Sequence, residues 1–342
     1  GQLTVRTVDT AGNATAGTGH SYTLDTTAPT ATATVTAISD DTGSSSSDWK
    51  TNNATQTVSG TLTGSLGSGE KIQVSADGGT TWVDATVSGS AWTTASGAVT
   101  LGATGQLTVR TIDTAANTTS GTGHSYTLDT TAPTVSSVAL TGATGAQNSY
   151  LNAGDVITAT VTMAEAVDVT GTPQLALNIG GTTVQANYAS GSGTSSLTFT
   201  YTILAAQTDA NGISIAANSL ALNSGTIVDI VSNTATITHS AVSDNNSYMV
   251  DTTAPTQTFT SFTRSGSSGS YSYTGTLSAA LSSGETLQYS NNNSTWTNFT
   301  GTFTNTGKTF TINTSNTNQT EYVRVIDLAG NIGTPTSRPI AL

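Results

Sequence analysis

The chain has 342 residues, of which 8 are Lys or Arg and 20 are Asp or Glu, so its formal net charge is −12 at pH 7. An acidic chain of this kind has no general attraction for nucleic acid or for an anionic membrane surface, and it favours cations. The absence of cysteine excludes disulfides, cysteine zinc sites and thiol catalysis. We find no run of about twenty apolar residues, and therefore predict no membrane-spanning helix.

A six-residue stretch, Asp-Thr-Thr-Ala-Pro-Thr, occurs three times and begins at Asp25, Asp129 and Asp251. Proline holds φ at about −65° and pushes the preceding residue towards extended conformations, so each copy is expected to be a stiff connector. We call these stretches seams. Residues 1–10 return almost unchanged at 105–114, and the offset of 105 − 1 = 104 residues equals 129 − 25. This spacing indicates tandem modules, each of which contacts only its neighbours.

Residues 1–24 match the last part of the module that follows them. Strands are expected at 3–8 and up to about residue 24, around a turn at 9–13. A lone two-stranded hairpin is marginal in water, so we expect this one to be poorly stabilised by itself. Because residue 1 falls in mid-repeat, we also expect the chain to be an excerpt of a longer polypeptide.

The module at 25–128 contains short apolar runs separated by turn signals, with no helical periodicity. A turn-rich acidic loop covers 39–48, and the Asp-Gly pair at 77–78 between apolar runs is a hairpin signal. Seven short strands in about a hundred residues are typical of a Greek-key β-sandwich. The expected strands include 31–38, 55–62, 71–76, 98–101, 107–112 and 123–128.

The module at 129–250 shows the clearest alternation in the chain. Ile157, Ala159 and Val161 alternate with threonines, which is the pattern of a half-buried antiparallel strand. A short helical turn is expected within 205–218.

The module at 251–342 returns to the earlier type, since 284–296 parallels 69–82, and its closing strands are expected at 322–326 and 334–340. We therefore predict an all-β fold, a tandem array of immunoglobulin-like Greek-key β-sandwich domains. Its parts are a C-terminal hairpin of a preceding domain at 1–24 and sandwiches at 25–128, 129–250 (enlarged) and 251–342.

An aspartate followed four residues later by an asparagine precedes the final strand of every module. The simplest explanation is a turn in which these side chains cap their own backbone. In an immunoglobulin-type sandwich the hairpin before the last strand lies at the pole where the chain enters, and the loop after the first strand lies where it leaves. The acidic loops should therefore meet at the seams. The aspartate–asparagine pairs of the four modules are Asp9/Asn13, Asp113/Asn117, Asp229/Asn233 and Asp327/Asn331.

This placement predicts a calcium ion (Ca²⁺) at each seam. Converging carboxylates repel one another unless a cation lies among them, and calcium takes 6–8 oxygen ligands in flexible geometry. The alternative is a set of solvated turn acids without metal. The expected ligands are Asp25, Asp113 and Asn117 at the first seam; Asp129, Asp40, Asp41, Asp48 and Asp229 at the second; and Asp251, Asp327 and Asn331 at the third.

No enzyme activity is expected. The sequence has no Ser-His-Asp arrangement, zinc-protease motif or glycine-rich phosphate loop, and its three histidines lie on or next to the final strands. Trp82 and Trp296 are repeat equivalents beside a hairpin, which favours core packing. Trp49 and Trp92 are the candidates for an aromatic platform that stacks on sugars.

Several motifs together resemble a known family. Val-Asp-Thr-Ala-Gly-Asn at 8–13, the seam sequence, Asp-Asp-Thr-Gly at 40–43 and Asp-Gly-Gly-Thr-Thr-Trp at 77–82 resemble the bacterial immunoglobulin-like repeats of very large secreted adhesins. These adhesins are exported by type I secretion and often carry RTX tails. The module at 129–250 is similar to a related repeat of cell-surface proteins, some of them tied to motility, through the motifs at 150–155, 171–175 and 191–194.

The resemblance implies an extracellular extender segment, in which calcium-stiffened sandwiches hold a distal binding domain away from the cell for adhesion or biofilm formation. Its implied partners are neighbouring immunoglobulin-like domains of the same longer chain, and self-association stays open. Neither nucleic acid nor membrane insertion is expected. The module at 251–342 departs from the pattern, because its residues 261–270 include no Asp or Glu. The junction after it is therefore expected to lack calcium.

Two other readings stay open. The chain could be a subunit of an S-layer, sheath or extracellular filament, in which the hairpin at 1–24 completes a fold in the next chain. It could also be a carbohydrate-binding surface module that uses its Thr and Asn faces.

Overall fold

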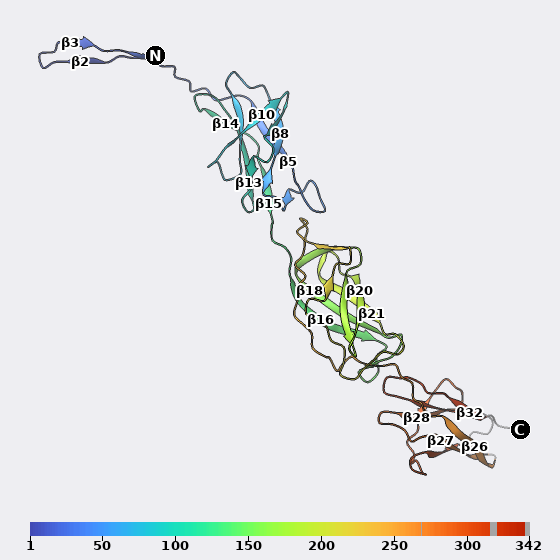
Figure 1. The fold of residues 1–342 in the computed structure, drawn as a ribbon. Coiled ribbons are helices and arrows are strands. Elements are labelled where there is room, and N and C mark those ends of the chain that lie inside the picture. Colours follow the sequence, from blue (N-terminus) through green and yellow to red (C-terminus); the bar gives the residue numbers. More distant parts are fainter. Residues whose placement is uncertain (268, 315–319, 339–342) are drawn as a thin grey trace. The chain divides into compact units, whose positions relative to one another are not determined.

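The computed structural model describes the chain apart from residues 268, 315–319 and 339–342 (Figure 1). All the regular secondary structure of the described residues is β-strand, which confirms the all-β prediction. Two compact units are present: Gly1–Ala132 with Asp229–Asn233, and Pro133–Val228 with Thr234–Leu342. No described segment forms a helix long and apolar enough to cross a membrane.

The N-terminal hairpin is exposed along both faces. Its strands pair antiparallel in two steps, β1 with β4 and β2 with β3. No hairpin residue belongs to a hydrophobic cluster of the described chain. The strands are β1 Gln2–Leu3, β2 Arg6–Val8, β3 Ala14–Ala16 and β4 His20–Ser21.

The first sandwich, residues 32–128, has a main sheet that folds back on itself and a separate two-stranded sheet of β7 and β12. The strand order of the main sheet is β5-β8-β11-β10-β9-β13-β15-β6. The path closes where Val35 donates its N–H to the carbonyl of Thr122 and Thr122 donates to Ala33. Eleven strand pieces replace the expected seven. They are β5 Thr32–Ile38, β6 Lys50–Thr51, β7 Thr55–Gln56, β8 Val58–Thr63, β9 Lys71–Ser75, β10 Val83–Ser88, β11 Ala91–Thr94, β12 Val99–Thr100, β13 Gly105–Ile112, β14 Thr118–Ser120 and β15 His124–Leu128.

The core of this sandwich follows the alternation of its strands. In β13, Leu107 and Val109 face inwards with Thr111, while Thr108 and Arg110 lie on the other face. Apolar side chains from both halves of the sheet pack between them, as expected for a sheet with one buried face. The buried members are Ala31, Ala33, Val35, Ile38, Val58, Leu62, Ile72, Val74, Trp92, Val99, Leu101, Leu107, Val109 and Tyr126.

The second sandwich, residues 135–251, has the largest core. Ile157, Ala159 and Val161 are fully buried on β18, as their alternation predicted. The expected helical turn in 205–218 is wrong. This segment contains the short strand β22, which pairs with β25, and isolated β-bridges join Ser214 to Asn178 and Ile215 to Val242. The strands are β16 Val135–Thr144, β17 Tyr150–Leu151, β18 Val156–Thr170, β19 Gln174–Ile179, β20 Thr182–Ser190, β21 Thr194–Thr202, β22 Thr208–Asp209, β23 Leu220–Ala221, β24 Thr226–Val228 and β25 Met249–Asp251.

The third sandwich, residues 259–338, consists of two separate sheets, with orders β26-β27-β30 and β29-β28-β31-β32. Tyr273, Phe310 and Val323 are among the side chains buried between them. The expected strand 334–340 is present as β32, and 339–340 lie outside the described residues. The strands are β26 Phe259–Ser267, β27 Ser270–Leu277, β28 Thr286–Ser290, β29 Thr297–Asn298, β30 Thr309–Thr314, β31 Glu321–Ile326 and β32 Thr336–Arg338.

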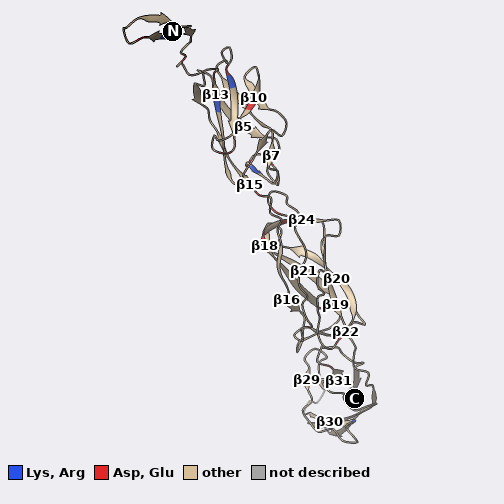
Figure 2. Cartoon of the chain, turned by 60° about the vertical axis from the view of Figure 1, so that its left-hand side comes forward, with Lys and Arg blue, Asp and Glu red and all other residues tan. Residues whose placement is uncertain are grey.

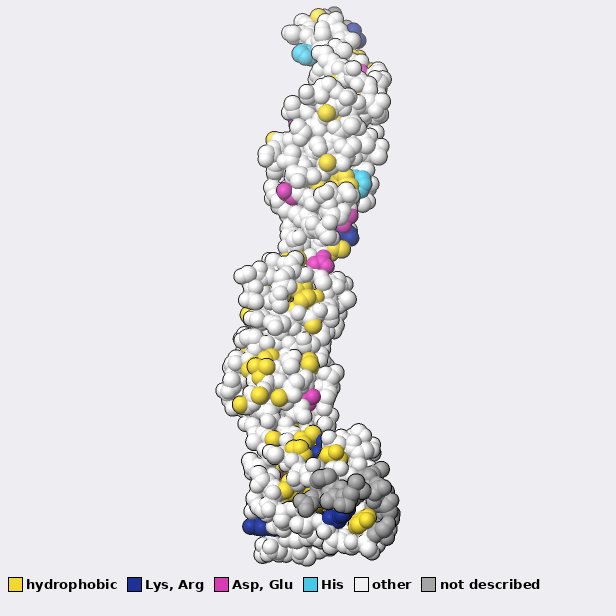
Figure 3. Space-filling view, turned by 90° about the vertical axis from the view of Figure 1, so that its right-hand side faces the viewer, with side chains coloured by type: hydrophobic (Ala, Val, Ile, Leu, Met, Phe, Trp, Pro, Cys, Tyr) yellow, Lys and Arg dark blue, Asp and Glu magenta, His cyan; other side chains and the backbone are white. Residues whose placement is uncertain are grey.

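Charged side chains are sparse on the molecule. Lys and Arg (blue) and Asp and Glu (red) occur as isolated points in Figure 2, in keeping with a charged fraction of 8%. The face shown in Figure 3 consists mostly of backbone and uncharged polar side chains, with only scattered hydrophobic atoms. Uncharged polar side chains, mainly Thr and Asn, therefore make most of the surface contacts with water that charged side chains make in most proteins.

Candidate functional site

The recurring Asp–Asn pair forms the same hydrogen-bonded turn in all four copies. In the copy of the first sandwich, Oδ1 of Asp113 accepts the backbone N–H of Asn117 at 2.9 Å, and Oδ2 accepts the Asn117 side-chain amide at 2.8 Å. The pairs at Asp9, Asp229 and Asp327 make both bonds at 2.7–2.9 Å. The turn explanation is therefore sufficient to account for the recurrence of the pair.

The residue before each asparagine has positive φ, which completes the turn. Gly12 and Gly330 supply it with φ of 87° and 85°, and Ala116 and Ser232 adopt it at 70° and 73°. Glycine reaches this region without a Cβ penalty, whereas Ala and Ser are strained there. The carboxylate bonds hold even the two unfavourable residues in place.

At each seam the asparagine amide also binds the connector. The Asn117 side chain donates to the backbone carbonyl of Asp25 at 3.2 Å. The equivalent distances are 2.9 Å from Asn233 to Asp129 and 2.8 Å from Asn331 to Asp251. One NH₂ group thus joins the turn to the start of the seam, and we call this arrangement the asparagine latch.

The seam aspartates point their carboxylates along the connector. Oδ1 of Asp25 accepts the N–H of Thr27 at 3.0 Å, and Asp129 and Asp251 bind the equivalent threonines at 2.9 Å. This is a local cap that stiffens the residues before the proline. The carbonyl, and not the carboxylate, is the group that these aspartates offer to the latch.

Hydrogen bonding tunes the acidity of the turn. The pKa of Asp113 lies below that of an ordinary aspartate, chiefly because the Asn117 side chain donates to its charged form, with backbone N–H groups adding to the effect. The pKa of Asp9 is lowered in the same way by Asn13. Both carboxylates therefore keep their charge to a lower pH than an ordinary aspartate does.

The first-loop acids at 40–48 mostly close their own loop. Oδ2 of Asp40 accepts the amide of Asn53 at 3.0 Å, and Asp48 pairs with Lys50 at 3.5 Å. Oδ2 of Asp41 accepts the N–H of Trp49 at 3.0 Å. Oδ1 of Asp41 is buried without a hydrogen-bond partner in the described part of the chain, the kind of orphan oxygen that a cation would satisfy.

At the second seam, Asp129 and Asp229 each have a carboxylate oxygen within 4.8 Å of the other. Asp229 is almost completely buried, with an exposed fraction of 2%. Two ionised carboxylates this close repel one another, and a cation between them would offset the repulsion. Ligation of a metal by Asp129, Asp229, Asp40, Asp41 and Asp48 stays a prediction.

The third seam is reinforced by amide side chains that the sequence did not indicate. Asn148 donates to the carbonyl of Leu328 at 2.9 Å, and Asn152 donates to that of Ala329 at 3.0 Å. Gln147 approaches so closely that any side chain at Gly330 would collide with it. The loop after β16 therefore binds the 327–331 turn through neutral side chains. Only the position of the loop, and not its residue types, could have indicated this.

The donor set of each latch fits calcium in kind. If the asparagine amide turned over, its Oδ1 would join a carboxylate oxygen and a carbonyl oxygen, giving three hard donors at one point. Water and nearby groups would have to supply the rest of the 6–8 ligands. In the structure, however, the NH₂ group occupies that point and holds both oxygens itself.

The aromatic candidates have different fates. Trp92 is 2% exposed within the first core, so it cannot stack on a sugar, and Trp49 stacks on His124 with ring centroids 3.7 Å apart. Trp82 is only half-buried, and the expectation that it packs in the core is wrong. It lies under the guanidinium of Arg110 at 3.8 Å.

The repeat equivalent of Trp82 is arranged in the same way. Trp296 is half-buried and lies under Arg324 at 4.0 Å, so its expected core position is wrong as well. Each of these arginines also donates to a glutamine on the neighbouring strand, Gln73 or Gln288. These cation–π pairs cover the outer face of each sheet and keep the indoles off the core.

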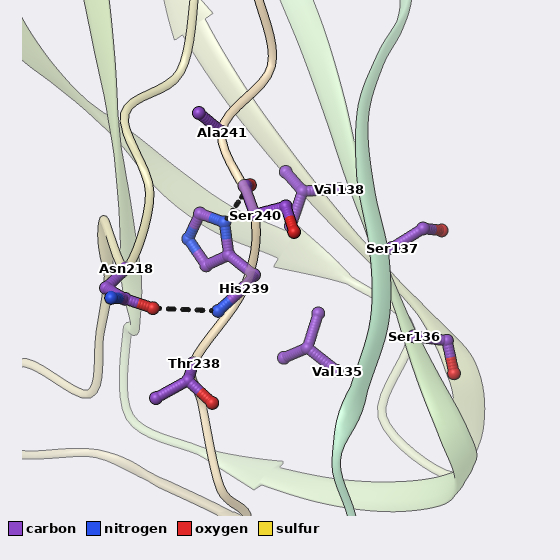
Figure 4. Close-up of a pocket in the computed structure, with 9 residues that line it drawn as sticks. All are labelled: Val135, Ser136, Ser137, Val138, Asn218, Thr238, His239, Ser240 and Ala241. Carbon is purple, nitrogen blue, oxygen red and sulfur yellow. Dashed lines mark hydrogen bonds between the residues drawn. The ribbon is translucent and has the colours of Figure 1, made fainter.

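His239 borders a hollow of about 440 Å³ beside β16 (Figure 4). Its Nε2 accepts the N–H of Ser219 at 2.9 Å, and its Nδ1 lies 2.8 Å from the carbonyl of Ser240. Both ring nitrogens are therefore engaged by backbone groups of neighbouring residues.

No known protein family and no curated protein matches this chain. Among solved structures it is similar to a marsupial T cell receptor, with 10% identity, a TM-score of 0.20, and 85% of this chain and 97% of that chain covered. It is also similar to SGBP-B of the Bacteroides ovatus mixed-linkage glucan utilization locus, solved with a mixed-linkage heptasaccharide (13%, TM-score 0.18, 91% and 73%). A third is native alpha-2-macroglobulin from Escherichia coli (8%, TM-score 0.17, 91% and 97%). Likenesses this distant carry no argument about function.

Proposed function

We propose that this chain is a structural extender segment of a large bacterial surface adhesin. In this role a tandem array of immunoglobulin-like sandwiches holds a distal binding domain away from the cell. The observation that carries the proposal is the asparagine latch, which recurs at all three seams between Asn117 and Asp25, Asn233 and Asp129, and Asn331 and Asp251. A tract that transmits position needs connectors with little freedom, and the latch removes freedom from each of them.

The third seam supports the same role by a second device. Asn148 and Asn152 add two hydrogen bonds from the loop after β16 to the 327–331 turn. Neutral hydrogen bonds are insensitive to salt, unlike exposed ion pairs. A joint of this kind keeps its stiffness across the ionic conditions outside a cell.

Calcium is the second part of the proposal, and it belongs above all to the second seam. Asp129 and Asp229 lie close together there, and Asp41 of the first loop has an unpaired buried oxygen. Extracellular modules bind calcium at roughly 10⁻⁴–10⁻³ M, so a site of this class fills outside the cell and stays empty in the cytoplasm.

Thermal unfolding of the full chain with calcium, magnesium and a chelator tests this part. A ligand that binds only the folded state raises its melting temperature. We expect a rise with calcium that Asp129→Ala removes and that Asp84→Ala, a change at an exposed Lys71 partner, leaves intact. Equal melting temperatures in calcium and chelator would remove calcium from the account and leave the latches as the stiffening device.

The runner-up function is a self-assembling surface or filament subunit. One observation favours it: the hairpin exposes Leu3, Val5 and Leu24, with exposed fractions of 66%, 59% and 77%. Sedimentation of the full chain in calcium separates the two proposals. An extender stays monomeric at all concentrations, whereas a filament subunit forms concentration-dependent polymers that Leu3→Ser or Leu24→Ser weakens.

A further inference from the structure

One oxygen of a buried carboxylate in the third sandwich has no hydrogen-bond partner in the part of the chain that the structure describes. Glu321 begins β31, is 3% exposed, and its Oε2 has no hydrogen-bond partner among the described residues. Burial raises the pKa of this carboxyl. A buried acid with an unsatisfied oxygen is costly, and an acid of this kind that borders a cavity is a candidate for a functional site.

The first sandwich shows what a purely structural residue would be at this place. The repeat aligns Glu321-Tyr322-Val323-Arg324 with Leu107-Thr108-Val109-Arg110, so Glu321 occupies the position of a leucine that is fully buried. The neighbouring inward positions, Val323 and Val109, are both buried valines. A carboxylate has therefore been placed in a core position that an apolar side chain fills elsewhere in the same chain.

The hollow next to this position also differs between the two sandwiches. Glu321 lines a cavity of about 450 Å³, together with Tyr289, Ser290, Asn292 and Thr297. The matching cavity of the first sandwich, bordered by Ser75, Asp77, Thr81 and Val83, measures about 130 Å³. The larger volume lies within the range of pockets for small organic ligands, roughly 300–1,000 Å³.

The acidic residue lies at a different place in each of the two cavities. In the first sandwich the acid is Asp77 on the rim, where Thr81 and Ser75 hydrogen-bond its carboxylate, so it is fully occupied. In the third sandwich the rim residue is neutral Asn292, whose Oδ1 accepts from Ser290 and Thr295. The rim is thus ordered in both, and in the third sandwich the charge faces the cavity from its buried end.

We propose that the cavity over Glu321 binds the ammonium group of a small organic cation. The site offers one carboxylate, several neutral oxygens and the ring of Tyr289, and this set matches a single positive charge with donor hydrogens. Ammonium groups bind both carboxylates and aromatic faces. Calcium would require more carboxylates than this single one, and a bare ion would leave most of the volume unused.

Calorimetric titration of the full chain with n-butylammonium chloride, in mildly alkaline buffer, tests the proposal. We expect binding to the wild type, about tenfold to a hundredfold weaker binding to Glu321→Gln, and no binding of n-butanol. Glu285→Gln is the matched control in the same sandwich, because its carboxylate bonds Gln257 and Ser282 outside this cavity, and it should keep wild-type affinity.

Equal affinity of the wild type and Glu321→Gln for n-butylammonium would overturn the proposal. Glu321→Leu, which restores the residue of the first sandwich, should fold and bind nothing.

Discussion

Two regions of this molecule have nearly the same sequence and different structures. Residues 1–24 and 105–128 differ at only four positions, at 8, 12, 14 and 16 against 112, 116, 118 and 120. Leu107 and Tyr126 have exposed fractions of 0% and 3%, whereas their equivalents Leu3 and Tyr22 have 66% and 48%.

The comparison separates what is local from what the rest of the sandwich supplies. The Asp9 turn forms with the same hydrogen bonds as the Asp113 turn, although its strands have no neighbours. The continuous eight-residue strand β13 becomes β1 and β2, of two and three residues, when β9 is not beside it. The residues of the segment itself therefore determine the turn geometry, whereas strand length and burial depend on the neighbouring strands.

The largest effect expected from this comparison follows from a pair of matched truncations. Leu107→Ala opens a cavity in the first core and should destabilise that sandwich by about 2–5 kcal/mol. Leu3→Ala removes an exposed side chain and should change stability by about 0.5 kcal/mol or less. Hydrogen exchange of β13 amides, read by mass spectrometry, gives both values, and similar losses for the two variants would contradict the burial difference.

The latch gives the next largest effect. Asn117→Ala removes the bonds to Asp113 and to the Asp25 carbonyl and should cost the first sandwich about 1–2 kcal/mol. Asn13→Ala removes only the bond within its own turn, and should leave the first sandwich unchanged. Amide exchange at residues 25–30 should rise in Asn117→Ala alone, and unchanged exchange there would show that the latch does not hold the seam.

Exchanging the residues before these asparagines gives a smaller effect. Ala116 has φ of 70°, so Ala116→Gly should relieve backbone strain and stabilise the first sandwich by roughly 0.5–1 kcal/mol. Gly12→Ala imposes the same strain on the hairpin turn, where nothing lies within 4 Å of the added carbon. Urea unfolding, followed by the fluorescence of the tryptophans in the first sandwich, measures the effect of Ala116→Gly. Destabilisation by Ala116→Gly would mean that unfolded-state entropy outweighs the strain.

The smallest effect concerns acidity. The Asp113 pKa is lowered by Asn117, so the ionised turn contributes stability above the unfolded pKa and loses it as the pH falls through the folded pKa. Because the Asp9 pKa is lowered by the same bonds, NMR titration should find both carboxyls more acidic than an ordinary aspartate. Each should return towards the ordinary value in the matching Asn→Ala variant, and an Asp9 of ordinary acidity would show that the turn needs the sandwich.

The sequence was sufficient for the features that depend on local chemistry. The turn at Asp113 and Asn117, the seams and the alternation at Ile157 follow from residue types and spacing. It also predicted that Asn117 approaches Asp25, because the hairpin before the last strand returns to the entry pole. It did not predict that the carbonyl of Asp25 is the group bound, since this depends on how one amide is turned.

Other features depend on contacts that residue types do not announce. The hairpin predicted at Asp77-Gly78 is confirmed, because β10 pairs with β9 across this turn, whereas β11 was missed because its pairing depends on neighbours across the sheet. Asn148 and Asn152 were not predicted because neutral amides are common in this chain and carry no charge that would mark them at a seam. Glu321 lies on an inward position of a regular alternation, but its charge argues for the outside, and only the structure places it in the core.

Small-angle X-ray scattering of the full chain tests the central claim most directly, that the asparagine latches stiffen the seams. The wild type is compared with a triple variant, Asn117→Ala, Asn233→Ala and Asn331→Ala, each in calcium and in chelator. The account predicts that the triple variant has a smaller maximum dimension and the scattering of a flexible chain in both conditions. Identical profiles for wild type and triple variant would contradict it, and would mean that proline and module packing hold the connectors without the latches.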